Sequence, residues 1–219
     1  MRGSVGLVTL DMKFASMFKE ASSKVGFKVI HVLSLDELPL SVKVVVTTEK
    51  EISKFAGNRT IVYAENYGSM EEILEKVMEI MLGIDIYKSV LIAIDPGKTV
   101  GVAYLVNDKI IKTSRYVYEE KMIDDLKSFL ERHRDAGEKI IIIGSTTTIE
   151  ESSRLLETLS KSLSKFEGLR MEIIDESRTA KGLIPKEKGV SRDEYSAILL
   201  SLRNKLKLRR VESNANTYS

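Results

Sequence analysis

Between residues 90 and 202 the sequence passes from three consecutive extended runs to an alternation of helical and extended segments, and few folds accommodate that order. The runs at residues 90–94, 100–106 and 110–117 are apolar and β-branched, as is typical of buried strands. Only Asn107-Asp108, a two-residue turn signal, separates the second run from the third. We therefore expect this part of the chain to begin with an antiparallel meander.

Helical and extended segments alternate after the meander. Apolar residues recur at helical spacing in three later segments, and two β-branched runs lie between them. The predicted helices begin at Lys121, Thr148 and Ser191, and the predicted strands cover residues 139–143 and 171–174. A glutamate follows Thr148 and Ser191 at the spacing of a capping box. The resulting order, β-β-β-α-β-α-β-α, predicts an α/β fold with a mixed sheet and helices on its faces.

The first part of the chain has the pattern of a separate α/β unit. Strands alternate with helices throughout it, and this alternation predicts a small parallel sheet covered by helices. The expected strands are residues 5–10, 27–33, 42–47 and 60–64, and the expected helices are residues 13–25, 50–55 and 69–82. The junction is expected at residues 83–89, so we predict two domains, residues 1–86 and 87–219.

The composition excludes several classes of chemistry. The chain has no cysteine, so disulfides and thiolate metal sites are excluded. Its two histidines, His31 and His133, lie in different segments, which argues against a histidine-rich zinc site or a Ser–His–Asp triad. No apolar run approaches the roughly 18 residues of a membrane span, and the N-terminus lacks a signal-peptide pattern. We expect a cytoplasmic protein with no membrane contact, whose chemistry depends on Asp, Glu, Lys and Tyr.

The sharpest local signal is the segment from Leu91 to Ala103, which contains Asp95-Pro96-Gly97. An apolar strand delivers the Asp95 carboxylate to its carboxyl end. Pro-Gly then turns the chain tightly, and Gly97 can take a positive φ and lets a backbone or a ligand come close. A phosphoryl-transfer site with two metal ions needs carboxylates from separate elements, so Asp95 alone is not sufficient.

This segment resembles the first-strand D-P-G motif of RuvC-type Holliday-junction resolvases and of the related YqgF-type nucleases. Residues 171–182, which contain Asp175-Glu176 and Arg178, look like the strand-five motif of the YqgF type. Residues 191–202 resemble the final acidic helix, in which an aspartate precedes an Ala-rich apolar run. The three matches occur in the order that the family has.

The resemblance implies a ribonuclease-H-like domain and a metal-dependent nuclease that hydrolyses phosphodiester bonds in structured or branched DNA or RNA. It implies that Asp95, Glu176 and Asp193 are catalytic and hold Mg²⁺ or Mn²⁺, which are hard cations suited to oxygen ligands. Asp175 is expected either as a fourth ligand or as a group that orients Arg178. RuvC-type enzymes cut as dimers, so a homodimer is left open, although no segment specifies an interface.

Basic residues concentrate toward the C-terminus. Residues 178–210 contain ten Lys or Arg and three Asp or Glu, a balance that suits a polyanion. The nucleic-acid-binding residues that we expect are Lys98, Arg178, Lys181, Lys186, Lys188 and Arg192. The alternative is a solvated helix whose cations lie near the negative end of its dipole.

Each carboxylate also has a purely structural interpretation. Asp95 would cap a turn, Asp193 would interact with a helix dipole, and Glu176 would pair with Arg178 at the surface. These readings stay open beside the catalytic one.

The end of the fourth strand departs from many relatives, which carry a carboxylate there. Here that strand ends at Ile143-Gly144, and a glycine at this place fits the YqgF-type pattern better than that of true resolvases. The alternative function is therefore a non-catalytic nucleic-acid-binding or scaffold protein that retains the fold. A third alternative gives the N-terminal unit the functional role, binding a partner or a small ligand.

Two other phosphate-binding patterns are excluded. Gly97-Lys98-Thr99 ends like a P-loop, but that motif needs a glycine five residues before Gly97, where the chain has Ile92. Actin-like and Hsp70-like ATPases also begin with a strand, Asp and Gly, yet they need a second phosphate loop and a far longer chain.

Overall fold

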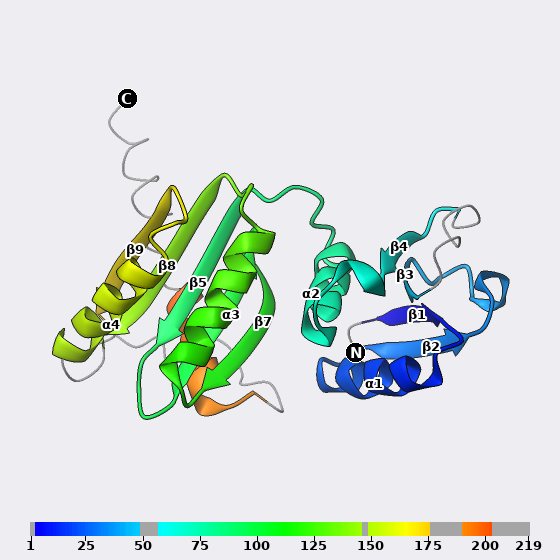
Figure 1. Cartoon of the computed structure of the whole chain (residues 1–219), viewed down its shortest axis with the longest axis horizontal. Helices are drawn as coiled ribbons and strands as arrows, with labels where there is room; N and C mark the ends of the chain where they lie inside the picture. Colours follow the sequence, from blue (N-terminus) through cyan, green and yellow to red (C-terminus); the bar gives the residue numbers. More distant parts are fainter. Residues whose placement is uncertain (1–2, 49–56, 146–148, 176–189, 203–219) are drawn as a thin grey trace. The chain divides into compact units, whose positions relative to one another are not determined.

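The computed structural model describes residues 3–48, 57–145, 149–175 and 190–202 of the 219-residue chain (Figure 1). The chain divides into two compact units, Met1–Asp85 and Ile86–Ser219. The expected domain boundary after residue 86 lies beside this division. Among the described residues, no helix is long and apolar enough to cross a membrane.

The first unit is built on a parallel sheet of four strands in the order β2-β1-β3-β4. The strands are β1 (Ser4–Val8), β2 (Lys28–Val32), β3 (Val44–Thr47) and β4 (Thr60–Tyr63), and the helices are α1 (Met12–Lys24) and α2 (Met70–Met81). Two short 3₁₀ helices that we did not predict, η1 (Leu35–Glu37) and η3 (Ala64–Asn66), follow β2 and β4. The predicted parallel α/β domain is confirmed, while the helix expected at residues 50–55 lies outside the described residues.

Side-chain caps determine where α1 and α2 begin. Asp11 Oδ1 accepts a hydrogen bond from the Phe14 N–H at 2.9 Å, and Ser69 Oγ accepts one from the Glu72 N–H at 3.2 Å. The segment after β2 contributes Leu35, Leu38 and Val42 to the core on one side of the sheet. Asp11 and Ser69 each lie at the end of a loop that leaves the carboxyl end of a strand, so each cap marks both the end of its loop and the start of its helix.

The second unit contains a mixed sheet of five strands in the order β7-β6-β5-β8-β9. β5 (Ser89–Asp95), β6 (Val100–Val106) and β7 (Lys109–Tyr116) pair antiparallel, and β8 (Glu138–Ser145) and β9 (Leu169–Asp175) extend the sheet from β5 in parallel. The helices are α3 (Glu119–Arg132), α4 (Ile149–Ser162) and a last one over residues 192–202, here called the C-helix. This is the ribonuclease-H-like order, so the predicted fold class is confirmed.

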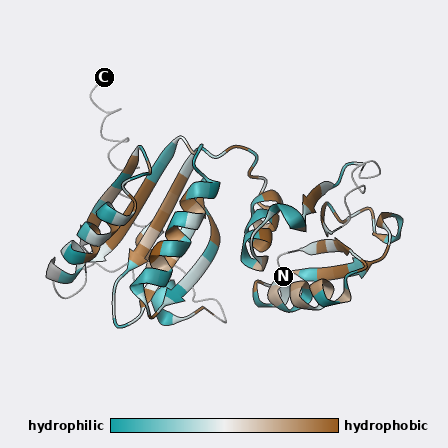
Figure 2. Ribbon diagram, in the orientation of Figure 1, coloured by the Kyte–Doolittle hydropathy of each residue, from teal (hydrophilic) through white to brown (hydrophobic). Residues whose placement is uncertain are grey.

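Helices cover both faces of the second sheet. α3 and α4 lie on one face, in front of the strands in Figure 1, and we call it the α3 face. The C-helix lies on the other, the C-helix face, where Ala197 and Leu200 share a core cluster with Leu91, Ala93 and Ile142. The central strands are apolar on both sides because they are buried from both directions (Figure 2).

The β6–β7 hairpin decides which side chains of β7 reach each face. Asn107 and Asp108 have φ angles of 47° and 67°, as a tight two-residue type I′ turn requires. Leu105 then pairs with Ile110 but Tyr104 pairs with Lys112, which makes Ile111 the extra residue of a β-bulge. Beyond the bulge, alternation places Lys112 and Tyr116 on the α3 face and Thr113 and Arg115 on the C-helix face.

A polar network is buried between α3 and the sheet. Asp125 accepts hydrogen bonds from Lys112 Nζ at 2.7 and 2.9 Å, from the Tyr104 hydroxyl at 3.1 Å and from the Tyr116 hydroxyl. The ammonium of Lys112 also lies 4.6 Å from the centre of the Tyr104 ring. The result is a satisfied ion pair with two phenol donors.

The pKa values of this network follow from its burial and its charges. Burial alone raises the pKa of Asp125, but the Lys112 ammonium and the donated hydrogen bonds outweigh it and leave that pKa below its usual value. Burial beside the same carboxylate raises the pKa values of Tyr104 and Tyr116. The carboxylate is therefore charged and both phenols are neutral donors at neutral pH.

Candidate functional site

Asp95 is the last residue of β5 and lies at the carboxyl edge of the parallel part of the sheet. It pairs with Gly101 across the β5–β6 ladder. Alternation from Ala93, which belongs to the core cluster under the C-helix, places the Asp95 side chain on the same face. The carboxylate is half-buried at this edge.

The turn at Gly97 does not use the positive φ that glycine allows. The backbone of Gly97 does not lie in the left-handed region, and a Cβ added to it would come no closer than 3.4 Å to the Thr99 carbonyl oxygen. The turn after Asp95 is therefore made without the conformational freedom of glycine.

Gly101 is the glycine that this edge requires. A Cβ added to Gly101 would lie 2.1 Å from the carbonyl oxygen of Asp193 and 2.3 Å from its carbonyl carbon. No side chain fits there, so the first turn of the C-helix lies directly on β6. Because Gly101 is the cross-strand partner of Asp95, this contact brings Asp193 to the same edge as Asp95.

The carboxylate of Asp193 accepts a hydrogen bond from the hydroxyl of Thr99, which lies in the loop after Asp95. This bond ties the first turn of the C-helix to the β5–β6 loop across 94 positions of sequence. The N-terminus of a helix also carries partial positive charge, which favours a carboxylate at this place. Asp193 is therefore held by both the loop and its own helix.

The start of the C-helix is fixed by the predicted capping box. Ser191 Oγ accepts from the Glu194 N–H at 3.2 Å, and Glu194 Oε2 accepts from the Ser191 N–H at 2.8 Å. The hydroxyl of Thr113 on β7 donates to Glu194 Oε1 at 2.9 Å. Burial raises the pKa of Glu194, but these bonds and the nearby Arg115 cation outweigh it and hold that pKa below its usual value.

Several predicted site residues cannot be placed. Glu176, Arg178, Lys181, Lys186 and Lys188 lie outside the described residues. The backbone of Asp175 ends β9 opposite Ser145, and its side chain is not described. Of the four carboxylates expected at a metal site, the described residues thus bring two, Asp95 and Asp193, to one edge. Within the described part of the chain no cluster of three or more possible ligands occurs, so metal binding stays a prediction.

The two remaining basic predictions lie at the same edge. Lys98, in the loop after Asp95, and Arg192, in the first turn of the C-helix, are both exposed. Phosphate binding by these two residues stays a prediction.

Sequence reasoning missed three residues that build this edge. Gly101 seats the C-helix, Thr99 binds Asp193, and Thr113 binds Glu194. Gly101 lies in the quoted segment, two residues after Thr99 and inside a predicted strand. A glycine in a strand is a signal that another backbone approaches closely. Thr99 and Thr113 carry no such signal, because their partners lie more than 80 positions away.

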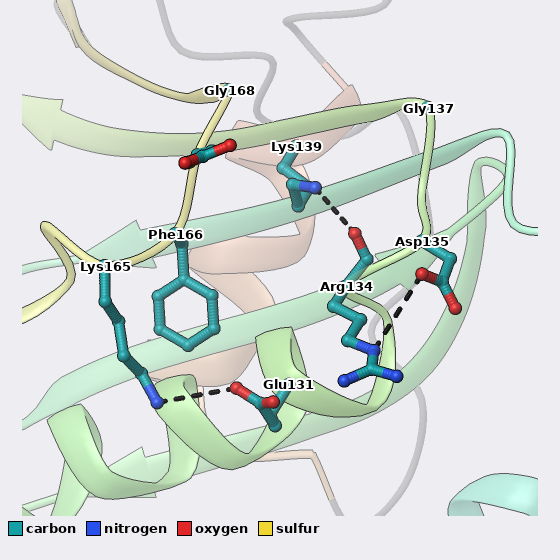
Figure 3. A pocket seen from close by; sticks show the side chains of 9 residues that line it. Glu131, Arg134, Asp135, Gly137, Lys139, Lys165, Phe166 and Gly168 are labelled. Atoms are coloured by element: carbon teal, nitrogen blue, oxygen red, sulfur yellow. Dashed lines mark hydrogen bonds and ion pairs between the residues drawn. The ribbon is translucent and has the colours of Figure 1, made fainter.

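An open groove of about 590 Å³ lies at the opposite edge of the sheet, where β8 begins (Figure 3). Its charged side chains are Glu131, Arg134, Asp135, Lys139, Lys165 and Glu167. Lys165 pairs with Glu131 at 3.4 Å, and Lys139 donates to the Arg134 carbonyl oxygen at 2.8 Å. With three charges of each sign, the groove has no preference for an anion or a cation, and it is far from Asp95.

Comparison with known proteins identifies no family for this chain. No family model matches the sequence, and no curated protein matches it. Among solved structures, the chain is similar to a protein of unknown function with an actin-like ATPase fold from Bacteroides thetaiotaomicron. The identity is 9% and the TM-score 0.30, over 69% of this chain and 51% of that one, so this chain spans about half the length of that protein. The strand order of the two sheets identifies an α/β protein whose second unit is ribonuclease-H-like.

Proposed function

We propose that the second unit is a metal-dependent nuclease of the RuvC/YqgF type, acting on structured or branched nucleic acid. The observation that carries the proposal is the contact of the C-helix with Gly101, which brings the carboxylates of Asp95 and Asp193 to one edge. A strand end and a helix start that converge in this way are the geometry a phosphoryl-transfer site needs. The D-P-G motif and the acidic last helix are the corresponding sequence features.

The residues at this edge suit a hard divalent cation. Both carboxylates supply oxygen donors, and the described residues offer no thiolate or imidazole at the site. Asp95 and Asp193 would hold Mg²⁺ or Mn²⁺, together with Glu176 as the sequence resemblance implies. When bound, the cation would supply Lewis-acid stabilisation of the negative charge that builds up on the phosphate.

The chain itself would do the positioning. Thr99 holds the Asp193 carboxylate toward the β5–β6 loop, and the capping box fixes the helix that carries it. Lys98 and Arg192 would bind the phosphates on either side and so align the strand with the carboxylates.

A second candidate is a nucleic-acid-binding scaffold without catalysis. The observation that favours it is the end of β8, where Gly144 stands at the level of Asp95 and offers no carboxylate. A metal held by fewer ligands would bind more weakly, while the basic residues would still bind phosphates.

Asp95→Asn separates the two candidates. The change keeps the size and most of the hydrogen bonding but removes the charge that holds a cation, so it should abolish Mg²⁺-dependent cleavage of duplex, single-stranded or four-way-junction substrates. Binding should survive or tighten, because an anion facing phosphates is lost. EDTA should reproduce the loss of cleavage in the wild-type protein.

The matched control is Asp108→Asn. Asp108 is an exposed acid in the β6–β7 turn, at the other end of the same sheet, and Asn tolerates its positive φ. It should cleave like wild type. A wild-type protein that binds these substrates but cuts none of them in Mg²⁺ or Mn²⁺ would support the scaffold instead.

A further inference from the structure

The β-bulge at Ile111 changes which side of the sheet receives Arg115. With the two-residue turn at Asn107-Asp108 and a regular ladder, Gly101 would pair with Ser114. The bulge shifts the register by one residue, and Gly101 pairs with Arg115 instead. Paired residues point to the same face, so the shift turns Arg115 from the α3 face to the C-helix face.

Arg115 consequently lies in one row with the candidate carboxylates. Asp95 pairs with Gly101, and Gly101 pairs with Arg115. The row crosses three neighbouring strands, so the Cα atoms of Asp95 and Arg115 are about 10 Å apart, two interstrand spacings. Asp193 lies over Gly101, in the middle of the row.

The guanidinium of Arg115 has no structural partner in the part of the chain that the structure describes. The charge of Arg115 acts on Glu194 and helps to lower its pKa. Yet Glu194 Oε1 accepts from Thr113 and Oε2 from the Ser191 N–H, and no ion pair with Arg115 forms. Arg115 is exposed and keeps its five donors available.

We propose that Arg115 binds a phosphate of the nucleic acid beside the carboxylates, as the anchor that sets where the strand crosses the site. This rests on the proposed function, which it deepens by naming a residue that positions the substrate. Arginine suits the role because its planar fork binds two phosphate oxygens at once, whereas lysine offers a point charge. With Lys98 in the loop and Arg192 on the C-helix, Arg115 gives this edge three exposed cations from three elements.

The test measures binding to labelled single-stranded, duplex and four-way-junction oligonucleotides in EDTA, in an Asp95→Asn background that cannot cleave. Arg115→Ala should raise the Kd about tenfold or more, as expected for loss of a hydrogen-bonded charge, and should reduce the slope of log K against log salt by about one. Arg115→Lys should recover part of the affinity but not all. The matched control is Arg134→Ala, an exposed arginine at the opposite edge, which should stay within about twofold of the parent.

A second arm measures Mg²⁺-dependent cleavage without the Asp95 change. If the wild-type protein cleaves and Arg115→Ala matches Arg134→Ala in both affinity and rate, the inference about Arg115 is wrong while the proposed function stands. If the wild-type protein neither binds nor cleaves, the proposed function fails and the inference fails with it. If Arg115→Ala and Arg115→Lys lose affinity in the order given and Arg134→Ala does not, the assignment is supported.

Discussion

The two faces of the second sheet use the same kinds of charged residue in opposite ways. On the α3 face, Lys112 and Asp125 are in direct contact, and two phenols complete the hydrogen bonds of the carboxylate. On the C-helix face, Arg115 and Asp95 share one row but are about two strands apart. Charges that satisfy one another stabilise a fold, whereas the exposed Arg115 guanidinium remains available to a ligand.

One irregularity serves both faces. The bulge at Ile111 sends Lys112 toward α3 and Arg115 toward the C-helix. Without it the two cations would exchange faces, so that Lys112 would lose Asp125 and the candidate site would lose its arginine. Bulges often re-aim side chains near active sites, and here one bulge couples a structural ion pair to a candidate binding residue.

The largest effect should come from breaking the paired face. Asp125→Ala leaves the Lys112 ammonium, whose side chain is 14% exposed, without its carboxylate, and removes the acceptor that two buried phenols share, so that they can bond only each other. We expect the free energy of unfolding to fall by about 3–5 kcal/mol, measured by urea denaturation at neutral pH. Asp124→Ala removes the neighbouring exposed acid and should cost less than about 0.5 kcal/mol. Equal losses would mean that the network contributes no more than a surface charge.

A smaller loss of stability, but a complete loss of cleavage, should follow from Gly101→Ala. The added Cβ overlaps the Asp193 backbone, so the C-helix must move away from β6, at about 1–3 kcal/mol. Asp193 then leaves the edge while Asp95 stays on its strand. Gly97→Ala adds a methyl group to the same loop region without an overlap and should change the free energy of unfolding by less than about 0.5 kcal/mol. A Gly101→Ala protein that still cleaves would show that Asp193 is not needed at the edge.

Much of the fold was predictable because its signals are local. Apolar alternation and helical periodicity identified the strands and helices of the second unit, and the pair Ser191 and Glu194 correctly marked the start of the C-helix. The turn at Asn107-Asp108 was predictable for the same reason, since both residue types tolerate positive φ.

The candidate site was only partly predictable because its contacts are not local. Asp95 and Asp193 stood out through a motif and a helix start, but nothing in the sequence marks Ile111 as a bulge. A regular ladder would have placed Arg115 under α3, on the opposite face of the sheet from Asp95. The bonds from Thr99 to Asp193 and from Thr113 to Glu194 likewise depend on where the C-helix docks.

The smallest effect is expected on the C-helix face of the sheet, from a change at Thr113. Thr113→Val keeps the shape of the side chain but removes the hydroxyl that donates to Glu194 Oε1. Loss of one such bond should cost about 1 kcal/mol at neutral pH.

Burial raises the pKa of Glu194, but the bonds from Ser191 and Thr113 and the charge of Arg115 outweigh it and bring that pKa below its usual 4.5. A carboxylate with a lowered pKa stabilises the fold above its unfolded pKa, and this contribution disappears as the pH falls through the folded pKa. The difference between wild type and Thr113→Val should therefore be full at pH 7 and should shrink below about pH 4.5, when followed by urea unfolding across this range.

Thr158→Val is the matched control, because the Thr158 hydroxyl bonds only the Arg154 carbonyl oxygen, at 3.0 Å, and its loss should not depend on pH. A Thr113→Val difference that is constant from neutral to acid pH would show that the hydroxyl does not bind the Glu194 carboxylate in solution, and that the first turn of the C-helix is held at this edge by its contact with Gly101 and by the bond from Thr99 to Asp193.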